Sequence, residues 1–123
     1  MKNRDEMVLR SLIDITEEVA AALKRFECHS FAQFISDDVL KRAMAMCLIS
    51  ISENVDLLTY EFRTQNEYIN FKVFKALRNI AAHKYGSINF EMVWEIITKN
   101  LPGYRLEFQR LLEKEMRNKG KIG

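Results

Sequence analysis

Residues that break helices are scarce in this sequence: its 123 residues include one proline and four glycines. So few breakers argue against a turn-rich β fold and favour long helices. Two cysteines, Cys28 and Cys47, are too few for a disulfide framework, and we expect both to be reduced and buried. No apolar run approaches the roughly 20 residues that a membrane-spanning helix needs. The first ten residues carry acids and lack the apolar core of a signal peptide. We therefore expect a cytoplasmic protein.

The composition is that of one folded domain spanning residues 1–123. Hydrophobic residues make up 48% of the chain and charged residues 29%, which is typical of a globular protein rather than a disordered one. The net charge of +2 neither requires nor excludes a nucleic-acid partner, so any such partner would need a local basic patch. Residues 118–123 are basic and contain glycine, and we expect this tail to fray.

Apolar residues that recur at intervals of three and four predict a chain made of helices. The expected helices cover residues 5–27, 37–58, 69–84 and 104–117, with a short helical turn at 31–35 and a polar loop at 61–67. An extension of the second long helix as far as Phe62 is left open. Asn89 is expected to cap a further helix, and Pro102 predicts a bend near Asn100.

The first helix is expected to bury one stripe and to expose its charges. The buried stripe is Leu9, Leu12, Ile13, Thr16, Val19, Ala20, Leu23 and Phe26, and Asp5 is placed with the charged residues outside. Phe31 and Phe34 are expected to plug the bundle. Ser36 is expected to cap the helix over residues 37–58.

That second helix is apolar on nearly every side, so it is either central or covered by a second subunit. A polar cluster, Ser50, Ser52, Glu53 and Asn54, interrupts it. One interpretation is a solvated stripe or a set of structural hydrogen bonds. The other is that Glu53 lines a functional cleft, where it orients Arg78 or His83.

Chemically versatile residues gather at the end of the predicted helix over residues 69–84. Arg78, Asn79, His83 and Tyr85 lie within eight positions, and Gly86 ends the helix. An arginine is a permanent charge that can bind phosphate oxygens with two N–H groups, and a histidine can transfer protons near neutral pH. Together these groups suit cleavage of phosphodiester bonds without a metal.

Helix geometry limits how Arg78 and His83 can act together. Five residues of a regular helix separate them by about 140° of rotation and about 7.5 Å of rise. A single regular helix therefore does not bring the two side chains together. Either the last turn unwinds, or a two-fold partner supplies a second copy of the motif.

The motif, together with landmarks along the chain, resembles the HEPN superfamily and, within it, the HepT toxin branch. The resemblance runs from about Asp5 to Glu115. Its landmarks are Phe34 and the apolar helix after it, Ser52-Glu53, Phe71 seven residues before Arg78, Val93-Trp94, and Leu101-Pro102. Phe71 stands where many relatives carry Trp. The resemblance implies an all-α, antiparallel four- to five-helix bundle that forms a homodimer with a cleft between subunits. It also implies metal-independent ribonuclease activity, with no cofactor.

The resemblance assigns roles to individual residues. It implies that Arg78 and His83 are catalytic, with Asn79 and Glu53 in support. It further implies that a partner nucleotidyltransferase of the MntA antitoxin type silences the toxin by placing AMP on Tyr85. A tyrosine that only packs at a dimer contact is the open alternative for Tyr85.

A basic line accompanies the motif and could follow an RNA backbone. Its members are Lys72, Lys75 and Lys84, although ordinary surface lysines are an equal alternative. No His, Cys, Asp and Glu set has metal-ligand spacing, and no glycine-rich phosphate loop is present. Two competing functions stay open: a non-catalytic nucleotide-binding subunit of a two-component nucleotidyltransferase, and a purely structural helical dimer.

Overall fold

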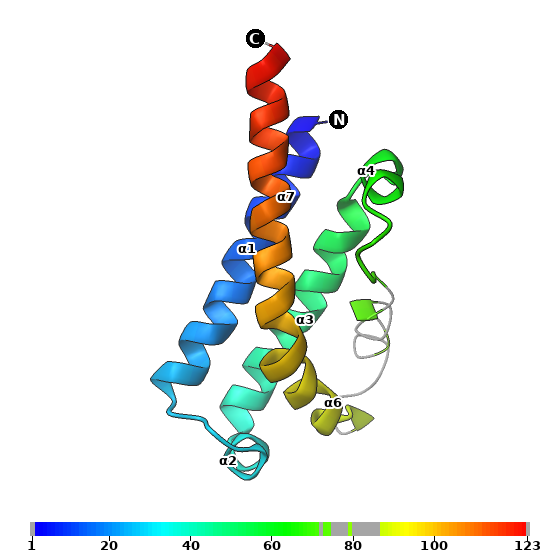
Figure 1. Ribbon diagram of the computed structural model, residues 1–123. Coiled ribbons are helices and arrows are strands. Elements are labelled where there is room, and N and C mark those ends of the chain that lie inside the picture. The colour runs from blue at the N-terminus through cyan, green and yellow to red at the C-terminus, as the bar shows by residue number, and fades with distance from the viewer. Residues whose placement is uncertain (1, 72, 75–78, 80–86, 123) are drawn as a thin grey trace.

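The computed structural model describes residues 2–71, 73–74, 79 and 87–122, and every regular element in these ranges is a helix. In chain order the elements are α1 (Lys2–Arg25), α2 (Phe31–Ser36), α3 (Asp38–Leu57), α4 (Tyr60–Gln65), α6 (Phe90–Glu95), the π-helix η2 (Ile96–Asn100) and α7 (Leu101–Ile122). The all-α prediction is confirmed. Helices α1 and α7 run side by side in opposite directions, and α3 packs against α1 (Figure 1). Figure 1 shows both termini at one end of the bundle.

Helix α1 buries most of its predicted stripe. Leu9, Leu12, Ile13, Thr16 and Val19 are buried, Leu23 is half-buried, and Ala20 and Phe26 are exposed, contrary to the prediction. Val8, which the prediction did not include, is buried as well. The helix ends at Arg25 rather than at Glu27, because Glu27 takes a positive φ of 50°. The Cys28 N–H then donates to the Leu23 carbonyl at 2.9 Å and the Glu27 N–H to the Lys24 carbonyl at 3.1 Å. This pair of bonds is the Schellman ending of a helix.

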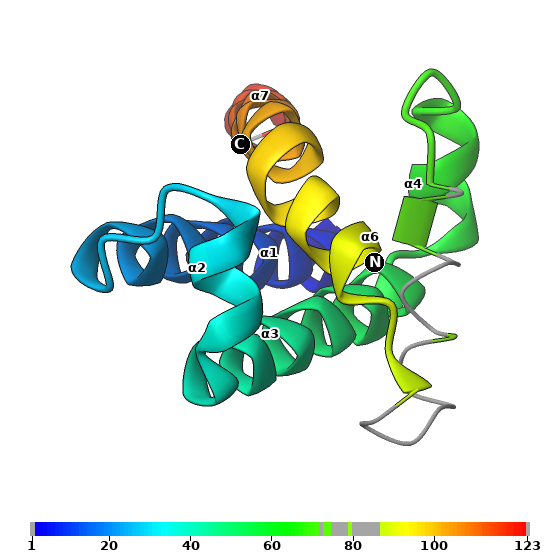
Figure 2. The ribbon, with the colours of Figure 1, turned by 90° about the horizontal axis from the view of Figure 1, so that it is seen from below.

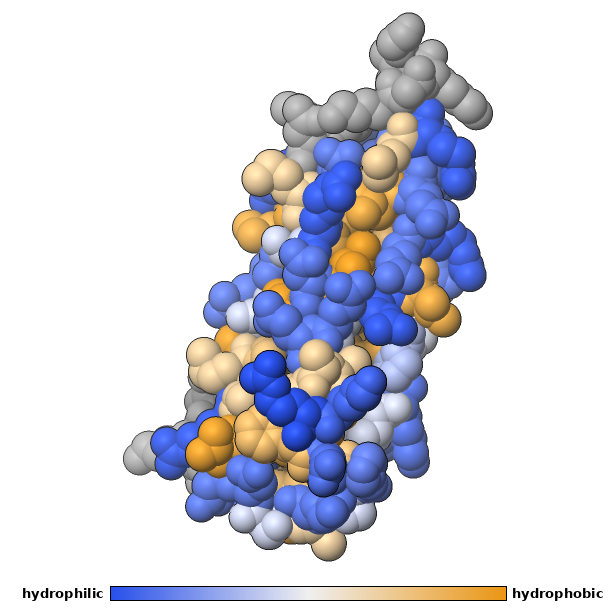
Figure 3. All heavy atoms as spheres, turned by 90° about the vertical axis from the view of Figure 1, so that its left-hand side faces the viewer, coloured by the Kyte–Doolittle hydropathy of each residue, from blue (hydrophilic) through white to orange (hydrophobic). Residues whose placement is uncertain are grey.

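One outer side of the bundle is largely polar (Figure 3). On the side that Figure 3 presents, hydrophilic side chains cover most of the surface, and hydrophobic ones are visible between them. The charged residues that the sequence placed on the outside of α1 agree with this view, apart from Asp5, which is 6% exposed. Among the described helices, none combines the length and apolar character that crossing a bilayer requires.

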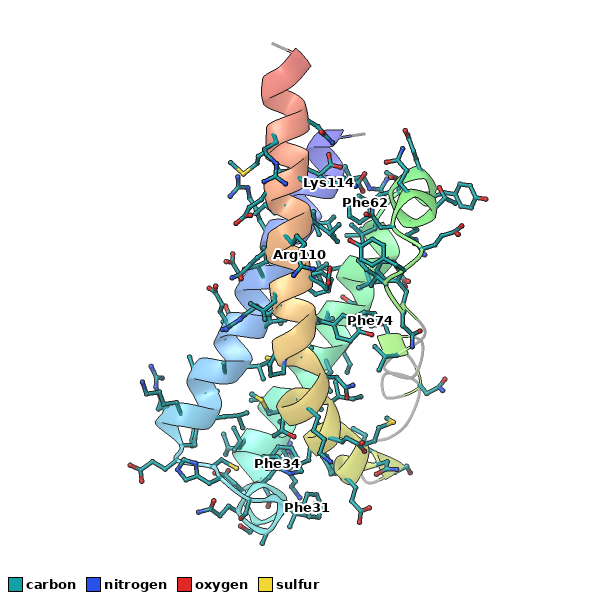
Figure 4. The ribbon with its side chains drawn as sticks, viewed as in Figure 1. Phe31, Phe34, Phe62, Phe74, Arg110 and Lys114 are labelled. Carbon is teal, nitrogen blue, oxygen red and sulfur yellow. The ribbon has the colours of Figure 1, made fainter. Side chains whose placement is uncertain are left out.

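Helix α2 closes one end of the bundle, as the sequence predicted for Phe31 and Phe34 (Figure 4). Phe34 is fully buried, and its ring lies 5.2 Å from the ring of Trp94 and 6.3 Å from that of Phe90. Phe31 is half-buried against the same core.

The predicted cap of α3 is wrong by one residue. Ser36 still belongs to α2, where its hydroxyl donates to the Gln33 carbonyl, whereas Asp37 has the extended backbone of a cap. The Asp37 carboxylate accepts from the Leu40 N–H at 3.0 Å. Both residues have short polar side chains, so only the backbone geometry distinguishes them.

The predicted loop at 61–67 is wrong over residues 61–65, which belong to α4. Leu58 ends α3, and the Thr59 side chain then accepts from the Phe62 N–H at 3.1 Å to start the new helix. Phe62 is 3% exposed and attaches α4 to the core. The extension of the preceding helix to Phe62, which the sequence left open, does not occur, because the helix breaks at Leu58 and Thr59.

The last part of the chain is one continuous helical run. Asn89 caps α6 as predicted, since its side-chain oxygen accepts from the Met92 N–H at 3.1 Å. The π-helix η2 occupies residues 96–100, where the sequence predicted a bend, and Pro102 follows it as the second residue of α7. Proline has no N–H to donate to a carbonyl of the preceding turn. The backbone stays helical to Ile122, whereas the sequence predicted a frayed tail over residues 118–123.

Candidate functional site

The predicted functional residues fall mainly on the segment between the described positions 74 and 87. Arg78, His83, Tyr85 and the lysines Lys72, Lys75 and Lys84 lie outside the described residues, so their predicted roles remain predictions. Asn79 is described: it is helical and exposed. Glu53 is also described and is exposed on α3. The site is therefore built from what holds the two ends of this segment.

The first end of the segment is held by Phe74, which is 3% exposed. Its ring lies 4.8 Å from the ring of Tyr104 in an edge-on arrangement and 6.3 Å from the ring of Phe108, both on α7. Aromatic pairs of this kind contribute roughly 0.5–1.5 kcal/mol beyond the area they bury. Figure 4 shows Phe74 on the side of its segment that faces α7. Arg78 follows Phe74 by four residues in the sequence, so Phe74 is the described contact that directly precedes the motif.

Two polar contacts reinforce that end. The Tyr104 hydroxyl donates to the Asn70 carbonyl at 2.6 Å, and burial raises the pKa of Tyr104. The Ser52 hydroxyl donates to the Phe74 carbonyl at 3.4 Å, which is long and therefore weak for a bond between oxygens. The sequence had placed Tyr104 only as the beginning of a helix. Its partner lies 34 positions away, and nothing in the local pattern indicates that bond.

The second end of the segment is held by residues just after it. Ile88 packs half-buried against the core, and Asn89 caps α6. Phe90 follows, and its ring lies against Phe34 and 5.1 Å from the ammonium nitrogen of Lys41. The described residues on both sides of the motif segment are therefore attached to the run from α6 to α7.

Most residues of the polar cluster on α3 fit the first interpretation, and only Glu53 is left for the second. Ser52 is buried and bonded to Phe74, and the Asn54 amide donates to the Ser50 carbonyl at 2.9 Å, so these residues make structural hydrogen bonds. Glu53 is exposed and makes no hydrogen bond or ion pair with any other described residue. Since Glu53 follows the residue that contacts Phe74, it lies close to the start of the motif segment. Its predicted role in orienting Arg78 or His83 remains a prediction.

A hollow on the described surface is poorly suited to phosphate. It has a volume of about 520 Å³ and lies among α1, α4 and α7. Its lining includes three carboxylates, those of Asp5, Glu61 and Glu115. Carboxylates repel a phosphodiester backbone, so this hollow is not the candidate site.

The two cysteine thiols are poorly suited to nucleophilic catalysis. Burial raises the pKa of both the Cys28 and the Cys47 thiols, and Glu18 adds to the effect at Cys47. Neutral thiols are poor nucleophiles. Within the described residues, no three His, Cys, Asp or Glu side chains are placed to hold a metal ion.

The region of this chain that matches known proteins includes all of the candidate site residues. A family model described as ribonuclease HepT-like matches residues 15–111. A candidate RNase of Caldanaerobacter subterraneus subsp. tengcongensis is 32% identical over 101 residues, which cover 82% of this chain and 90% of that protein. A candidate RNase of Methanocaldococcus jannaschii is 25% identical over 114 residues, covering 92% of each chain. No solved structure matches the chain significantly.

Proposed function

Because the chain belongs to the HepT-like ribonuclease family, we propose that it is an endoribonuclease whose cleaving groups are Arg78 and His83. The observation that supports this most directly is the position of the motif. The segment that carries it lies inside the matched residues 15–111 and between the two ends held at Phe74 and Asn89. Phe74 and Asn89 are themselves attached to the helical core, so the described residues on either side of the motif have defined positions.

The proposed reaction needs no metal and uses the RNA's own 2′-hydroxyl. His83 takes the proton of that hydroxyl, and the oxygen attacks the neighbouring phosphorus. The bond from phosphorus to the 5′-oxygen breaks, and a second acid, either water or a His83 from another copy, protonates the leaving oxygen. Arg78 stabilises the charge that builds on the phosphoryl oxygens, and Asn79 orients His83 or the phosphate. The products are a 2′,3′-cyclic phosphate and a 5′-hydroxyl.

Tyr85 is the proposed point of control. A partner nucleotidyltransferase of the MntA antitoxin type would join the α-phosphorus of ATP to the Tyr85 hydroxyl oxygen, releasing pyrophosphate and a proton. The added negative charge next to Arg78 would neutralise the guanidinium and exclude RNA. A Tyr85→Phe variant is therefore expected to stay toxic in cells that make the transferase. Full protection of cells that carry this variant would contradict the proposed control.

The chain offers its own matched control for the catalytic test, because its two histidines differ in position. His83 belongs to the motif, whereas His29 is exposed in the turn between α1 and α2. Labelled RNA is incubated in EDTA with wild type, His83→Ala and His29→Ala. Loss of a general base costs about 10²–10⁴ in rate. We expect that loss for His83→Ala and wild-type cleavage for His29→Ala.

The outcomes separate the candidate functions. Cleavage that disappears in EDTA would indicate a metal enzyme and overturn the mechanism. Cleavage that survives in His83→Ala would remove His83 from it. Nucleotide binding without cleavage would favour the non-catalytic binding subunit. The same preparations report the terminal groups of the products, and a 3′-hydroxyl in place of a cyclic phosphate would exclude attack by the 2′-oxygen.

A further inference from the structure

One side of α7 carries three cations in a row. Arg110, Lys114 and Arg117 are all exposed, and they follow one another at intervals of four and three. That spacing keeps side chains on one face of a helix. We define these three residues as the cationic stripe of α7. Figure 4 shows Arg110 and Lys114 on successive turns of α7, toward the end of the bundle where both termini lie.

The cationic stripe lies on the side of α7 that is away from the core. Leu101 and Phe108 are buried, and they lie about 180° and about 160° round the helix from Arg110. Figure 1 and Figure 2 agree that no other described helix covers the side of α7 that is turned away from α3. The apolar side of α7 therefore serves its own bundle, and the stripe is open to another molecule.

The cations of the stripe are available to an anionic partner. Lys114 and Arg117 make no ion pair or hydrogen bond with any other described residue. Arg110 pairs with Glu107 at 2.7 Å, although its side chain is 67% exposed. Exposed pairs of this kind stabilise a protein little, so a phosphate can replace the carboxylate beside Arg110 at small cost.

Positive charge is concentrated in the part of the sequence that contains the stripe. Residues 110–123 hold five cations and two acids, which gives a net charge of +3. Residues 1–109 then have a net charge of −1, because the whole chain has +2. One of the two acids, Glu115, lines the hollow among α1, α4 and α7 and so lies away from the stripe. A basic segment of this kind is typical of proteins that bind nucleic acid.

A nucleic-acid strand fits the stripe better than a membrane does. Seven residues of helix place Arg110 and Arg117 about 10 Å apart along the axis, and a strand carries one charge about every 3.4 Å. The stripe therefore matches about three consecutive phosphates of one strand. A helix that binds a membrane needs an apolar face to enter the bilayer. The apolar face of α7 is occupied instead, because Phe108 and Leu111 are buried in the core.

We propose that the cationic stripe of α7 binds the phosphate backbone of the RNA strand that is cleaved at the motif. The stripe begins close to the residue that precedes the motif, since Phe108, two positions before Arg110, has its ring 6.3 Å from that of Phe74. The inference rests on the proposed ribonuclease function, which supplies the RNA. A strand that reaches both the motif and the stripe must extend well beyond the cleaved bond, so the stripe gives a preference for long substrates.

The first test is the binding of a labelled, unstructured RNA by fluorescence anisotropy at several salt concentrations, in a His83→Ala chain that leaves the RNA uncut. The stripe variant has glutamine at all three stripe positions, and glutamine is a good helix former. The charge control has glutamine at Lys24, Arg25 and Lys99, which are exposed on α1 and η2, so it loses the same charge.

We expect the stripe variant to reduce the slope of log affinity against log salt by about 2, at roughly 0.7 per contact on single strands, and the charge control to keep the slope of its parent. A stripe variant with the parent's slope, an equal loss in both variants, or a parent that binds no RNA would overturn the proposal. So would a stripe that retains vesicles containing phosphatidylserine while the RNA slopes stay equal, because the stripe would then be a membrane site.

The second test separates the stripe from the cleavage itself. In chains that keep His83, kcat/KM is measured for a dinucleotide and for a long unstructured RNA. We expect the stripe variant to lose the preference for the long RNA and the charge control to keep it, and a preference retained in the stripe variant would contradict the proposal. If no protein cleaves but the slopes still differ, the ribonuclease function fails and the stripe stands. If cleavage is normal and the slopes are equal, the stripe fails and the function stands.

Discussion

The hydroxyl of Tyr104 connects α7 to the stretch that leads into the motif. It donates to the Asn70 carbonyl at 2.6 Å, while its ring packs on Phe74. A change from Tyr104 to Phe keeps the ring and removes only the hydroxyl. Because a hydrogen bond of this type contributes about 0.5–1.5 kcal/mol, we expect Tyr104→Phe to lower the free energy of unfolding by that amount in urea titrations. Tyr68→Phe is a suitable control, since Tyr68 is 65% exposed.

The same variant should change how stability depends on pH. Burial raises the pKa of Tyr104 in the folded state, so the folded protein holds this proton more tightly than the unfolded chain does. The stability that this proton adds to the folded state is fully present below the ordinary tyrosine pKa of about 10, and it is lost as the pH rises above that value. We expect Tyr104→Phe to lose less stability than wild type over that alkaline range, and an identical alkaline slope in the two proteins would contradict this assignment.

At the scale of elements, the join between α3 and α4 depends on Thr59. Its side chain accepts from the Phe62 N–H at 3.1 Å and donates to an Asp5 carboxylate oxygen at 2.8 Å, while its N–H donates to the other oxygen at 2.9 Å. One residue therefore caps α4 and attaches it to the beginning of α1. Asp5 is buried as a consequence of this bonding.

We expect Thr59→Ala to cost about 1–3 kcal/mol of folding free energy, because it removes a cap and leaves a buried carboxylate with one partner fewer. Thr59→Ser should restore most of the loss, since it keeps the hydroxyl. Denaturation of Thr59→Ala, Asp5→Ala and the double variant measures the coupling, which should be non-additive. Strict additivity would mean that the two side chains act independently. Asp14→Ala, at an exposed position of α1, serves as the control.

These contacts explain where prediction from sequence succeeds and where it fails. The helix periodicity of α1 is clear because a regular stripe of apolar residues must face the core. The failure at α4 has a physical cause: only Tyr60 and Phe62 of this short helix are hydrophobic, and the partner of its cap lies 54 positions away in the chain. Asp5 was placed at the surface for the same reason, since a carboxylate near the start of a helix looks solvated until its distant partner is known.

The candidate site likewise has features that the sequence reveals and contacts that it does not. Arg78, His83 and Tyr85 are recognisable because their types and spacing are unusual, whatever the fold around them. The contacts that hold the segment are not recognisable, because Asn70 and Phe74 meet Tyr104 only after α7 has packed. The local pattern therefore identifies reactive groups, and the long-range packing decides how they are supported.

At the scale of the whole molecule, a net charge of +2 leaves RNA binding to a local group of cations. If Lys72, Lys75 and Lys84 contact phosphates, each releases counterions on binding, and the affinity then falls steeply with salt. We expect the triple change of these residues to glutamine to reduce the slope of log affinity against log salt by about 2, given roughly 0.7 per contact on single strands. Filter binding to His83→Ala protein avoids cleavage during the measurement.

A triple change elsewhere controls for net charge alone. Lys24, Arg25 and Lys99 are exposed on α1 and η2, and their replacement by glutamine removes the same charge. The salt slope of this control should stay close to that of the parent. Equal slopes in the two triple variants would place the phosphate contacts outside the basic line.

The π-turn η2 changes the direction in which side chains point around the axis of the helical run from Phe90 to Ile122. Each residue of a helix advances the side chains by about 100°, so the wider turn at residues 96–100 shifts everything beyond it around the axis relative to α6. Phe90 and Trp94 can therefore face α2 while Tyr104 and Phe108 face Phe74. A shortening of η2 by a single residue would turn one of these aromatic pairs away from its partner by about 100°, with the chain otherwise unchanged in composition.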